Sequence, residues 1–309
     1  MIGARQGTGA RQESAPALIV EGLVKRYPVP GGEDVLAVAG IDFEVARGEV
    51  YGFLGPNGAG KTTTIRMLTG LARPTAGRAQ VLGLDLARDL PRIKKRIGVV
   101  PEPSNLYAEL SAQDNLLFCM QLYGVPRAER LPRAHELLAQ FRLAEKRDTP
   151  FAKLSRGMRR ALTVAAALAH RPELVFLDEP TTGLDVASAR GLRATIAELR
   201  GQGVTVFLTT HYLEEAERLC DRIALIARGR IVTVDTVEGL RARVAGTTAV
   251  ELTLEGAEGT PETRRVAGED VESALRAALN QAQGRRVLSV NTVRPTLEDA
   301  FIQLTGLEK

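Results

Sequence analysis

One short segment of the chain restricts its fold more than any other. Residues 55–62 read Gly-Pro-Asn-Gly-Ala-Gly-Lys-Thr, which fits the pattern G-x-x-x-x-G-K-T of a phosphate-binding loop. The apolar run 50–54 precedes this loop and predicts a buried strand, and residues 62–68 read as a helix. The chemistry of such a loop requires a strand before it and a helix after it. The segment therefore predicts an α/β fold with a site for a nucleoside triphosphate.

Each part of the loop has an expected role. The glycines let the backbone turn its N–H groups toward phosphate oxygens, and the helix N-terminus adds partial positive charge. Lys61 is expected to reach the β- and γ-phosphates, and the Thr62 hydroxyl to bind Mg²⁺. The alternative is a glycine-rich turn before a helix, without a ligand. The expected nucleotide-binding residues are Gly55, Pro56, Asn57, Gly58, Ala59, Gly60, Lys61, Thr62 and Thr63.

Composition narrows the class of protein. The 309 residues are enough for about two domains. With 44% hydrophobic and 25% charged residues, the chain resembles an ordinary soluble globular protein. The formal net charge of +4 is too small to indicate nucleic acid by itself. Cys119 and Cys220 lack the spacing of a metal site and are expected to be buried apolar residues.

The termini and the apolar runs suggest a location. The longest apolar run, 161–169, is far shorter than the ~20 residues of a membrane helix. Residues 1–15 lack an apolar stretch of secretory type and predict a disordered tail. The chain is therefore expected in the cytoplasm, and attachment to a membrane partner stays open.

The apolar periodicity predicts how the rest of the chain is organised. Strands are expected at 18–24 and 35–45, and helical spacing extends from 112 to 171. Strands and helices then alternate up to about residue 227, which predicts a parallel sheet with covered faces. Beyond residue 240 the pattern predicts a small α+β domain. Its expected elements are a strand at 248–254, a loop at 256–268, a helix at 271–283, a strand at 287–293 and a helix at 297–304.

Two carboxylates follow an apolar strand in the second half of the chain. The strand is expected at 174–177 and ends in Asp178 and Glu179. Ligands of open α/β sheets bind at this edge, beyond the carboxyl ends of the strands. Asp178 is expected to belong to the Mg²⁺ shell, and Glu179 to orient and deprotonate an attacking water. The simpler interpretation is a solvated strand end.

Three further segments give the chain a family resemblance. Residues 154–158, Leu-Ser-Arg-Gly-Met, resemble the LSGGQ signature of ABC-type ATPases, with Arg156 in place of Gly and Met158 in place of Gln. Residues 181–185 resemble the D-loop of that family, and residues 207–211 resemble its strand with a switch histidine. The order and spacing of the motifs extend the resemblance over residues 16–240.

The resemblance implies roles for further residues. Ser155 and Gly157 would approach the γ-phosphate of a nucleotide held by a second subunit. Asp185 would lie at the dimer interface, and His211 would contact the γ-phosphate. Two other histidines, His135 and His170, are expected to be structural.

Two more positions match the family in part. Tyr27 corresponds to the aromatic residue that stacks on adenine, although taken alone it would be an ordinary surface tyrosine. Glu102 occupies the place of the family's Q-loop glutamine. A glutamate can still bind Mg²⁺ but brings a charge, so Glu102 is expected to belong to the metal site.

The resemblance also implies an architecture. Residues 16–240 would form one nucleotide-binding domain, a P-loop NTPase core with an antiparallel β subdomain and a helical insert at about 103–170. Residues 241–309 would form the small α+β domain. The runs 209–217 and 295–301 are most similar to the daunorubicin and multidrug-resistance exporter ATPases.

That subfamily implies an ATPase that powers export of drugs, lipids or similar hydrophobic compounds. ATP and Mg²⁺ would be the cofactors. The partners would be a separate transmembrane permease and a second ATPase subunit, identical or paralogous. Nucleic acid would not be a partner. The chain would lie on the inner face of the cell membrane. Two alternatives stay open: an ABC ATPase that acts on ribosomes or DNA, and a regulatory module in which residues 241–309 bind a ligand.

Overall fold

The computed structural model describes residues 15–244, 248–256, 260–268, 270–282, 284–293 and 296–306. Residues 1–14 of the predicted tail lie outside these ranges. The chain forms two compact units, and each unit consists of two stretches of sequence. The first unit comprises Met1–Glu49 and Thr62–Phe207, and the second comprises Val50–Lys61 and Leu208–Lys309. The phosphate loop therefore belongs to the second unit up to Lys61.

An antiparallel sheet lies in the first unit. Its strand order is β2-β1-β4-β5, and β1 pairs antiparallel with both β2 and β4. Gly77 must be a glycine, since its φ is +84° and a Cβ there would lie 2.2 Å from the carbonyl oxygen of Gly22. This sheet confirms the predicted antiparallel β subdomain. Its strands are β1 (Leu18–Tyr27), β2 (Val35–Val45), β4 (Ala76–Val81) and β5 (Leu84–Asp85).

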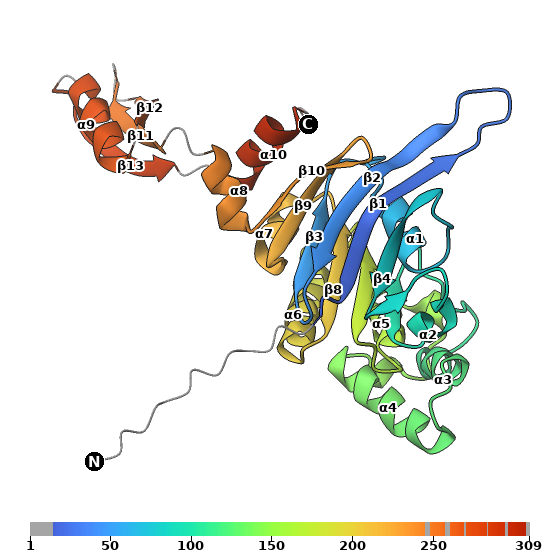
Figure 1. Ribbon diagram of the computed structural model, residues 1–309. Helices are drawn as coiled ribbons and strands as arrows, with labels where there is room; N and C mark the ends of the chain where they lie inside the picture. The colour runs from blue at the N-terminus through green and yellow to red at the C-terminus, as the bar shows by residue number, and fades with distance from the viewer. Residues whose placement is uncertain are drawn as a thin grey trace, which may run out of the picture. The chain divides into compact units, whose positions relative to one another are not determined.

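Helices dominate the middle of the first unit. α3 (Ala112–Leu122), α4 (Arg127–Gln140) and α5 (Arg156–Ala167) pack against one another, as the green ribbons of Figure 1 show. The predicted helical insert is thus helical, and its boundaries stay a prediction. The other helices of this stretch are α1 (Lys61–Leu68), α2 (Leu90–Lys94), α6 (Val186–Gly201) and the short 3₁₀ helices η1 (Ala144–Lys146) and η2 (Phe151–Lys153).

A six-stranded sheet has the strand order β10-β9-β3-β8-β7-β6. β3 pairs parallel with β9, β6 pairs parallel with β7, and β10 pairs antiparallel with β9. Every residue of β3, β7 and β8 is buried, as expected for strands covered on both faces. The strands are β3 (Val50–Leu54), β6 (Ile97–Val100), β7 (Leu174–Asp178), β8 (Thr205–Thr210), β9 (Arg222–Ala227) and β10 (Arg230–Asp235).

The second unit has a core to which the last helix contributes. α10 (Leu297–Thr305) packs against α8 (Val237–Val244) and α7 (Leu213–Leu219), and its buried Leu297 shares a cluster with Leu225 of β9. A reciprocal pair of hydrogen bonds between Thr296 and Asp299 caps the start of α10. The expected domain boundary at residue 240 stays a prediction.

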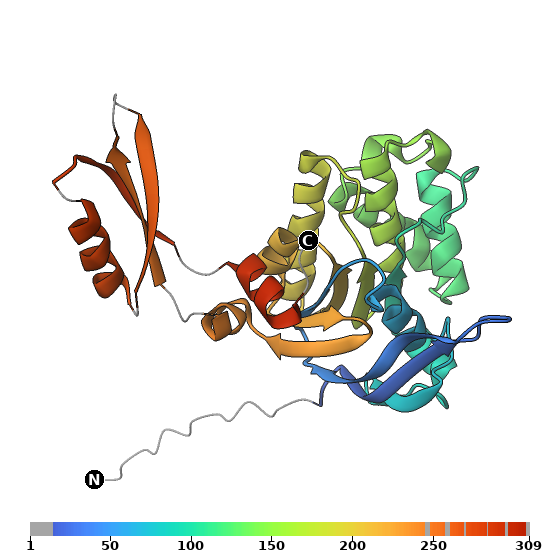
Figure 2. The same ribbon diagram turned by 90° about the horizontal axis from the view of Figure 1, so that it is seen from above.

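A three-stranded antiparallel sheet belongs to the same unit and has the order β12-β11-β13. α9 (Val271–Ala282) covers one face of this sheet (Figure 2) with the small residues Ala274 and Ala278. The loop predicted at 256–268 is wrong for most of its length, because β12 pairs with β11 there. Its charged sequence, in which Val266 is the one buried side chain among the described residues of the strand, concealed the strand. The strands are β11 (Thr248–Glu255), β12 (Pro261–Gly268) and β13 (Val287–Val293).

Candidate functional site

The glycines of the phosphate loop are required by its backbone. A Cβ at Gly55 would lie 2.2 Å from the carbonyl oxygen of Ile226 in β9, so no other residue fits there. Gly58 and Gly60 have φ values of +79° and +105°, in the region that favours glycine. The loop therefore has the tight turn that was predicted from its sequence.

Lys61 is buried within the second unit and lies over the loop. Its exposed fraction is 5%, and its ammonium group donates to the carbonyl oxygens of Gly55 (2.7 Å) and Pro56 (3.2 Å). This geometry places a cation above a loop whose predicted ligand is a phosphate chain.

His211, the predicted switch histidine, belongs to the same unit as the loop up to Lys61. The N–H of Gly55 donates to the carbonyl oxygen of Thr210, at 3.3 Å, and His211 is the next residue. The His211 ring is half-buried and lies 4.0 Å from the Tyr212 ring, centroid to centroid. The structure thus brings His211 close to the start of the phosphate loop.

Two of the three predicted Mg²⁺ ligands, all of which belong to the first unit, contact each other. The Thr62 hydroxyl donates to Oδ1 of Asp178 at 3.1 Å, and Asp178 is 4% exposed. A hydroxyl and a carboxylate oxygen side by side are hard ligands of the kind that Mg²⁺ prefers. These residues therefore fit the ion that the sequence implies. Thr63, the next predicted nucleotide-binding residue, is half-buried.

Glu179 is held in an unusual conformation. It is 7% exposed, and its φ of +47° lies in the left-handed region that L-residues disfavour. The Thr182 hydroxyl donates to Oε2 of Glu179 at 3.2 Å, and the N–H of Thr182 donates to its carbonyl oxygen at 3.3 Å. Strained residues of this kind gather at functional sites.

The signature segment has structural contacts within its own unit. Ser155 caps α5 by accepting the N–H of Met158 at 3.2 Å. A Cβ on Gly157 would lie 2.2 Å from the Ser188 hydroxyl, so packing against α6 requires a glycine there. Asp185 caps α6, and hydrogen bonds from the N–H and hydroxyl of Ser188 hold its pKa below the usual range. The nucleotide contacts of these residues stay predictions.

Arg156, a departure from the family signature, contacts the neighbouring D-loop segment. Its Nη2 donates to the carbonyl oxygen of Thr182 at 3.4 Å, and its guanidinium occupies the space that a Cβ on Gly183 would need. The side chain that replaces a glycine therefore links two motifs of the same chain.

Tyr27 and Glu102 are both found in the first unit. Tyr27 ends β1 and is half-buried, with the ammonium of Lys25 4.9 Å from the centre of its ring. Glu102 follows β6, and its side chain is exposed. Their contacts with adenine and metal stay predictions.

The comparisons with known proteins decide the family. The family model described as ABC transporter matches residues 38–182. The daunorubicin resistance ATP-binding protein DrrA3 of Streptomyces coeruleorubidus is 40% identical, over 94% of this chain and 96% of that protein. The Nod factor export ATP-binding protein I of Ralstonia nicotianae is 39% identical, over 96% of this chain and 95% of that protein. The chain belongs to the ABC transporter family.

A solved structure supports the same conclusion for the fold. A dimeric ATP-binding cassette in a post-hydrolysis state, bound to ADP and Pi, is similar with a TM-score of 0.66 and 25% identity. The match covers 71% of this chain and 98% of the chain in that structure. The predicted P-loop ATPase fold and the resemblance to drug-resistance ATPases are therefore confirmed. In the part of the chain that the structure describes, no helix could cross a membrane.

Two residues that contact Glu179 in this ABC ATPase were not predicted from its sequence. The Thr182 hydroxyl donates a hydrogen bond to the carboxylate of Glu179, and Arg160 donates one to the main-chain carbonyl oxygen of Glu179. A signal for Arg160 existed, because it lies on the same face of α5 as the buried residues Val164 and Ala167. A charged residue on an apolar stripe predicts a buried and partnered group.

The two other histidines have structural contacts. Nε2 of His170 bonds to the carbonyl oxygen of Ile97 at 2.9 Å, and its ring stacks on Tyr123 at 3.7 Å. Burial lowers the pKa of His170. His135 bonds to Oε1 of Gln113 at 3.0 Å.

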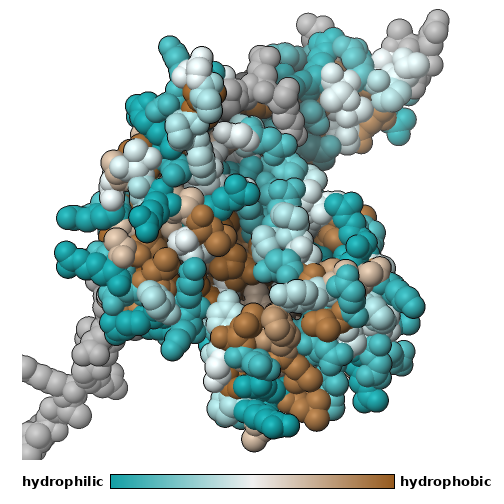
Figure 3. Space-filling view, turned by 90° about the vertical axis from the view of Figure 1, so that its right-hand side faces the viewer, coloured by the Kyte–Doolittle hydropathy of each residue, from teal (hydrophilic) through white to brown (hydrophobic). Residues whose placement is uncertain are grey.

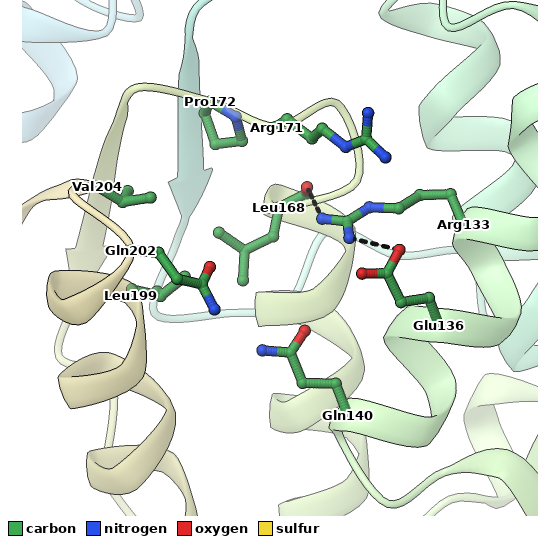
Figure 4. Close-up of a pocket in the computed structure, with 9 residues that line it drawn as sticks. All are labelled: Arg133, Glu136, Gln140, Leu168, Arg171, Pro172, Leu199, Gln202 and Val204. Atoms are coloured by element: carbon green, nitrogen blue, oxygen red, sulfur yellow. Dashed lines mark hydrogen bonds and ion pairs between the residues drawn. The ribbon is translucent and has the colours of Figure 1, made fainter.

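A cavity of about 540 Å³ lies in the first unit, and none of the predicted site residues line it. Figure 4 shows Arg133 at its wall, bound to Glu136 and to the carbonyl oxygen of Leu168. Among the described residues, no group of three metal-ligating side chains was found. The residues that line the cavity are Arg133, Glu136, Gln140, Leu168, Arg171, Pro172, Leu199, Gln202 and Val204.

Proposed function

We propose that this chain is the ATP-hydrolysing subunit of a membrane exporter for drugs, lipids or similar hydrophobic compounds. The observation that carries the site assignment is the hydrogen bond between Thr62 and Asp178, next to the buried Glu179. It joins the residue after Lys61 to the strand end on which a catalytic carboxylate is expected. The names of two relatives, which describe daunorubicin resistance and Nod factor export, support export.

The chemistry assigned to the site follows from the side chains. The phosphate loop binds the triphosphate through its N–H groups and Lys61. Thr62 and Asp178 hold Mg²⁺, which neutralises charge on the phosphates, and Glu102 contributes to the same shell. Glu179 orients and deprotonates the attacking water. His211 contacts the γ-phosphate, and Tyr27 stacks on adenine.

A second ATPase subunit completes each site in this proposal. Ser155 and Gly157 lie at the start of α5, where a helix N-terminus favours an anion. Asp185 starts α6 beside them, bound to the Ser188 that packs on Gly157. These residues would face the γ-phosphate bound by the other subunit, with two ATP molecules between head-to-tail subunits. The dimeric relative with ADP and Pi supports this arrangement.

The helical insert is proposed to bind a separate transmembrane permease. A groove of about 520 Å³ between α3 and α4 is lined by Leu117, Phe118 and Leu131 among other residues. Figure 3 shows the side of the molecule on which α3 lies in Figure 1. Apolar residues form patches on this side. Such patches are typical of interaction surfaces. The chain would thus be held at the inner face of the cell membrane.

The test is co-purification of the full-length chain from detergent-solubilised membranes. A polytopic membrane protein should accompany the wild-type chain. Leu131→Glu should reduce this co-purification and leave basal ATP hydrolysis unchanged, since Leu131 is 47% exposed in the groove. Leu279→Glu, at an equally exposed position on α9, is the matched control and should retain the partner. Recovery of ribosomes or DNA instead of a membrane protein would contradict the proposal.

A further inference from the structure

Arg160 is a buried arginine that binds the main chain at the carboxyl end of β7. It belongs to α5 and is 8% exposed. Its Nη2 donates to the carbonyl oxygens of Asp178 (2.8 Å) and Glu179 (3.2 Å). Its Nε donates to the carbonyl oxygen of Pro180 at 2.9 Å. One side chain therefore binds three consecutive carbonyls centred on Glu179.

The same guanidinium reaches the end of the neighbouring strand. Its Nη1 donates to the carbonyl oxygens of Pro101 and, at 3.2 Å, Glu102. These residues follow β6, which pairs with β7, and they precede the helical insert. Arg160 thus connects the strand end that carries Glu179 to the segment that leads into α3.

The backbone of Glu179 needs such support. At a φ of +47°, the Cβ of an L-residue crowds the neighbouring carbonyl oxygen. Conformations of this kind persist only where the surrounding structure fixes them. Because Arg160 binds the carbonyls before, at and after Glu179, it fixes the peptide planes from which that side chain projects.

The acceptors explain why an arginine is suited to this position. A guanidinium presents five N–H donors in one rigid plane, whereas an ammonium presents three on a flexible stem. The contacts described above are all to main-chain carbonyls of two strand ends. This pattern fixes the geometry of the main chain at both strand ends.

We infer that Arg160 is a positioning residue for ATP hydrolysis. It holds Glu179 in the orientation of a general base and couples that orientation to the segment at residues 101–102. The inference rests on the proposed role of Glu179 as the base. The competing explanation is a purely structural arginine, because its loss leaves buried carbonyls without a donor and lowers stability.

Steady-state ATP hydrolysis by the full-length chain separates these explanations. Arg160→Gln should lower kcat about 10- to 100-fold, since a misplacement of ~1 Å can cost about 100-fold, with KM for ATP within about twofold of wild type. Arg160→Lys should lose less, because it keeps the charge and some donors. Each variant is assayed well below its own Tm. An unchanged kcat in both variants would overturn the inference.

Arg133→Gln is the matched structural control. Arg133 is also mostly buried, with a 15% exposed side chain, and donates to the carbonyl oxygen of Leu168 at 3.2 Å. Its loss should lower the Tm and leave kcat unchanged. If Arg133→Gln lowered kcat as much as Arg160→Gln, the effect would be a general loss of stability, and the inference would fail.

A double-mutant cycle tests whether Arg160 acts through Glu179. If it does, adding Arg160→Gln to Glu179→Gln should cause no further loss of kcat. If the fold-losses of kcat caused by Arg160→Gln and Glu179→Gln multiply in the double variant, the inference is overturned. If Arg160→Gln does not fold, the same cycle is run with Arg160→Lys. Normal turnover by Glu179→Gln would instead refute the proposed base, so the two failures are distinguishable.

Discussion

Two glutamates flank β7 and differ in almost every respect. Glu173 precedes the strand, has a 43% exposed side chain and binds two arginines, Arg96 (2.6 Å) and Arg47 (3.1 Å). Glu179 follows the strand, is 7% exposed and has a left-handed backbone. At Glu173 the arginines bind the carboxylate, while at Glu179 an arginine binds the surrounding main chain.

The difference shows how one residue type acquires two roles. The hydrogen bond from Arg96 lowers the pKa of Glu173 and occupies its oxygens, which suits an ion pair and not a base. At Glu179, by contrast, Arg160 binds the main-chain carbonyl oxygens of Asp178 and Glu179. A charged residue at a strand end is therefore assigned a role from the atoms that its partners bind, not from its type.

The largest effect is expected from Glu179→Gln. The substitution keeps the shape and removes the base, so kcat should fall by ~10²–10⁴ while ATP still binds. Phosphate release and nucleotide titration measure the two quantities. With ATP, the variant should accumulate as a dimer in size-exclusion chromatography. Turnover near wild type would mean that the two glutamates do not differ in chemistry.

Lys61→Ala should give the next largest effect. The role proposed for Glu179 requires a triphosphate in the phosphate loop, and Lys61 is the cation expected on the β- and γ-phosphates. A charged hydrogen bond contributes about 1.5–3 kcal/mol, so ATP affinity should fall at least about 10-fold. Titration with a fluorescent ATP analogue measures it. The matched control is Lys94→Ala, on the exposed side of α2, which removes the same charge. This variant should bind ATP with wild-type affinity. Equal affinities for the two variants would exclude Lys61 from the site.

The sequence predicts those features that depend on neighbours in the chain. The phosphate loop and the strand end at Asp178 and Glu179 were predicted, because a short pattern of residue types defines them. The helical periodicity of the insert was also predicted correctly. Such features need no knowledge of a distant partner.

The features that escaped prediction depend on distant segments. β12 is a strand because β11 pairs with it, although its own residues are mostly polar. The left-handed φ of Glu179 and the contact between Arg156 and Gly183 both arise where separate motifs pack together. Arg160 on α5 is buried with carbonyl partners at the carboxyl ends of two strands, β6 and β7. One sequence without its fold does not reveal which groups meet.

Glu173→Gln should have a small effect, confined to stability. Because both partners are partly exposed, the ion pairs should contribute about 1 kcal/mol or less. Folding holds the pKa of Glu173 below its ordinary value of 4.5, so this contribution is present above that pH and is lost as the pH falls through the folded pKa. Urea unfolding at several pH values tests this, and kcat should not change. A large loss of kcat would make the two ends of β7 functionally equivalent.

The last effect concerns the pH dependence of stability at His170, which also lies near the amino end of β7. Burial holds its pKa below the ordinary 6.5, so the unfolded chain takes up a proton first as the pH falls. Stability should therefore decrease as the pH falls below about 6.5, by at most about 1.4 kcal/mol per pH unit for one proton. His170→Gln should remove this slope, and His135→Gln, on an exposed part of α4, should retain it. Urea unfolding between pH 7 and pH 5 decides the matter, because an unchanged slope in His170→Gln would show that another group titrates.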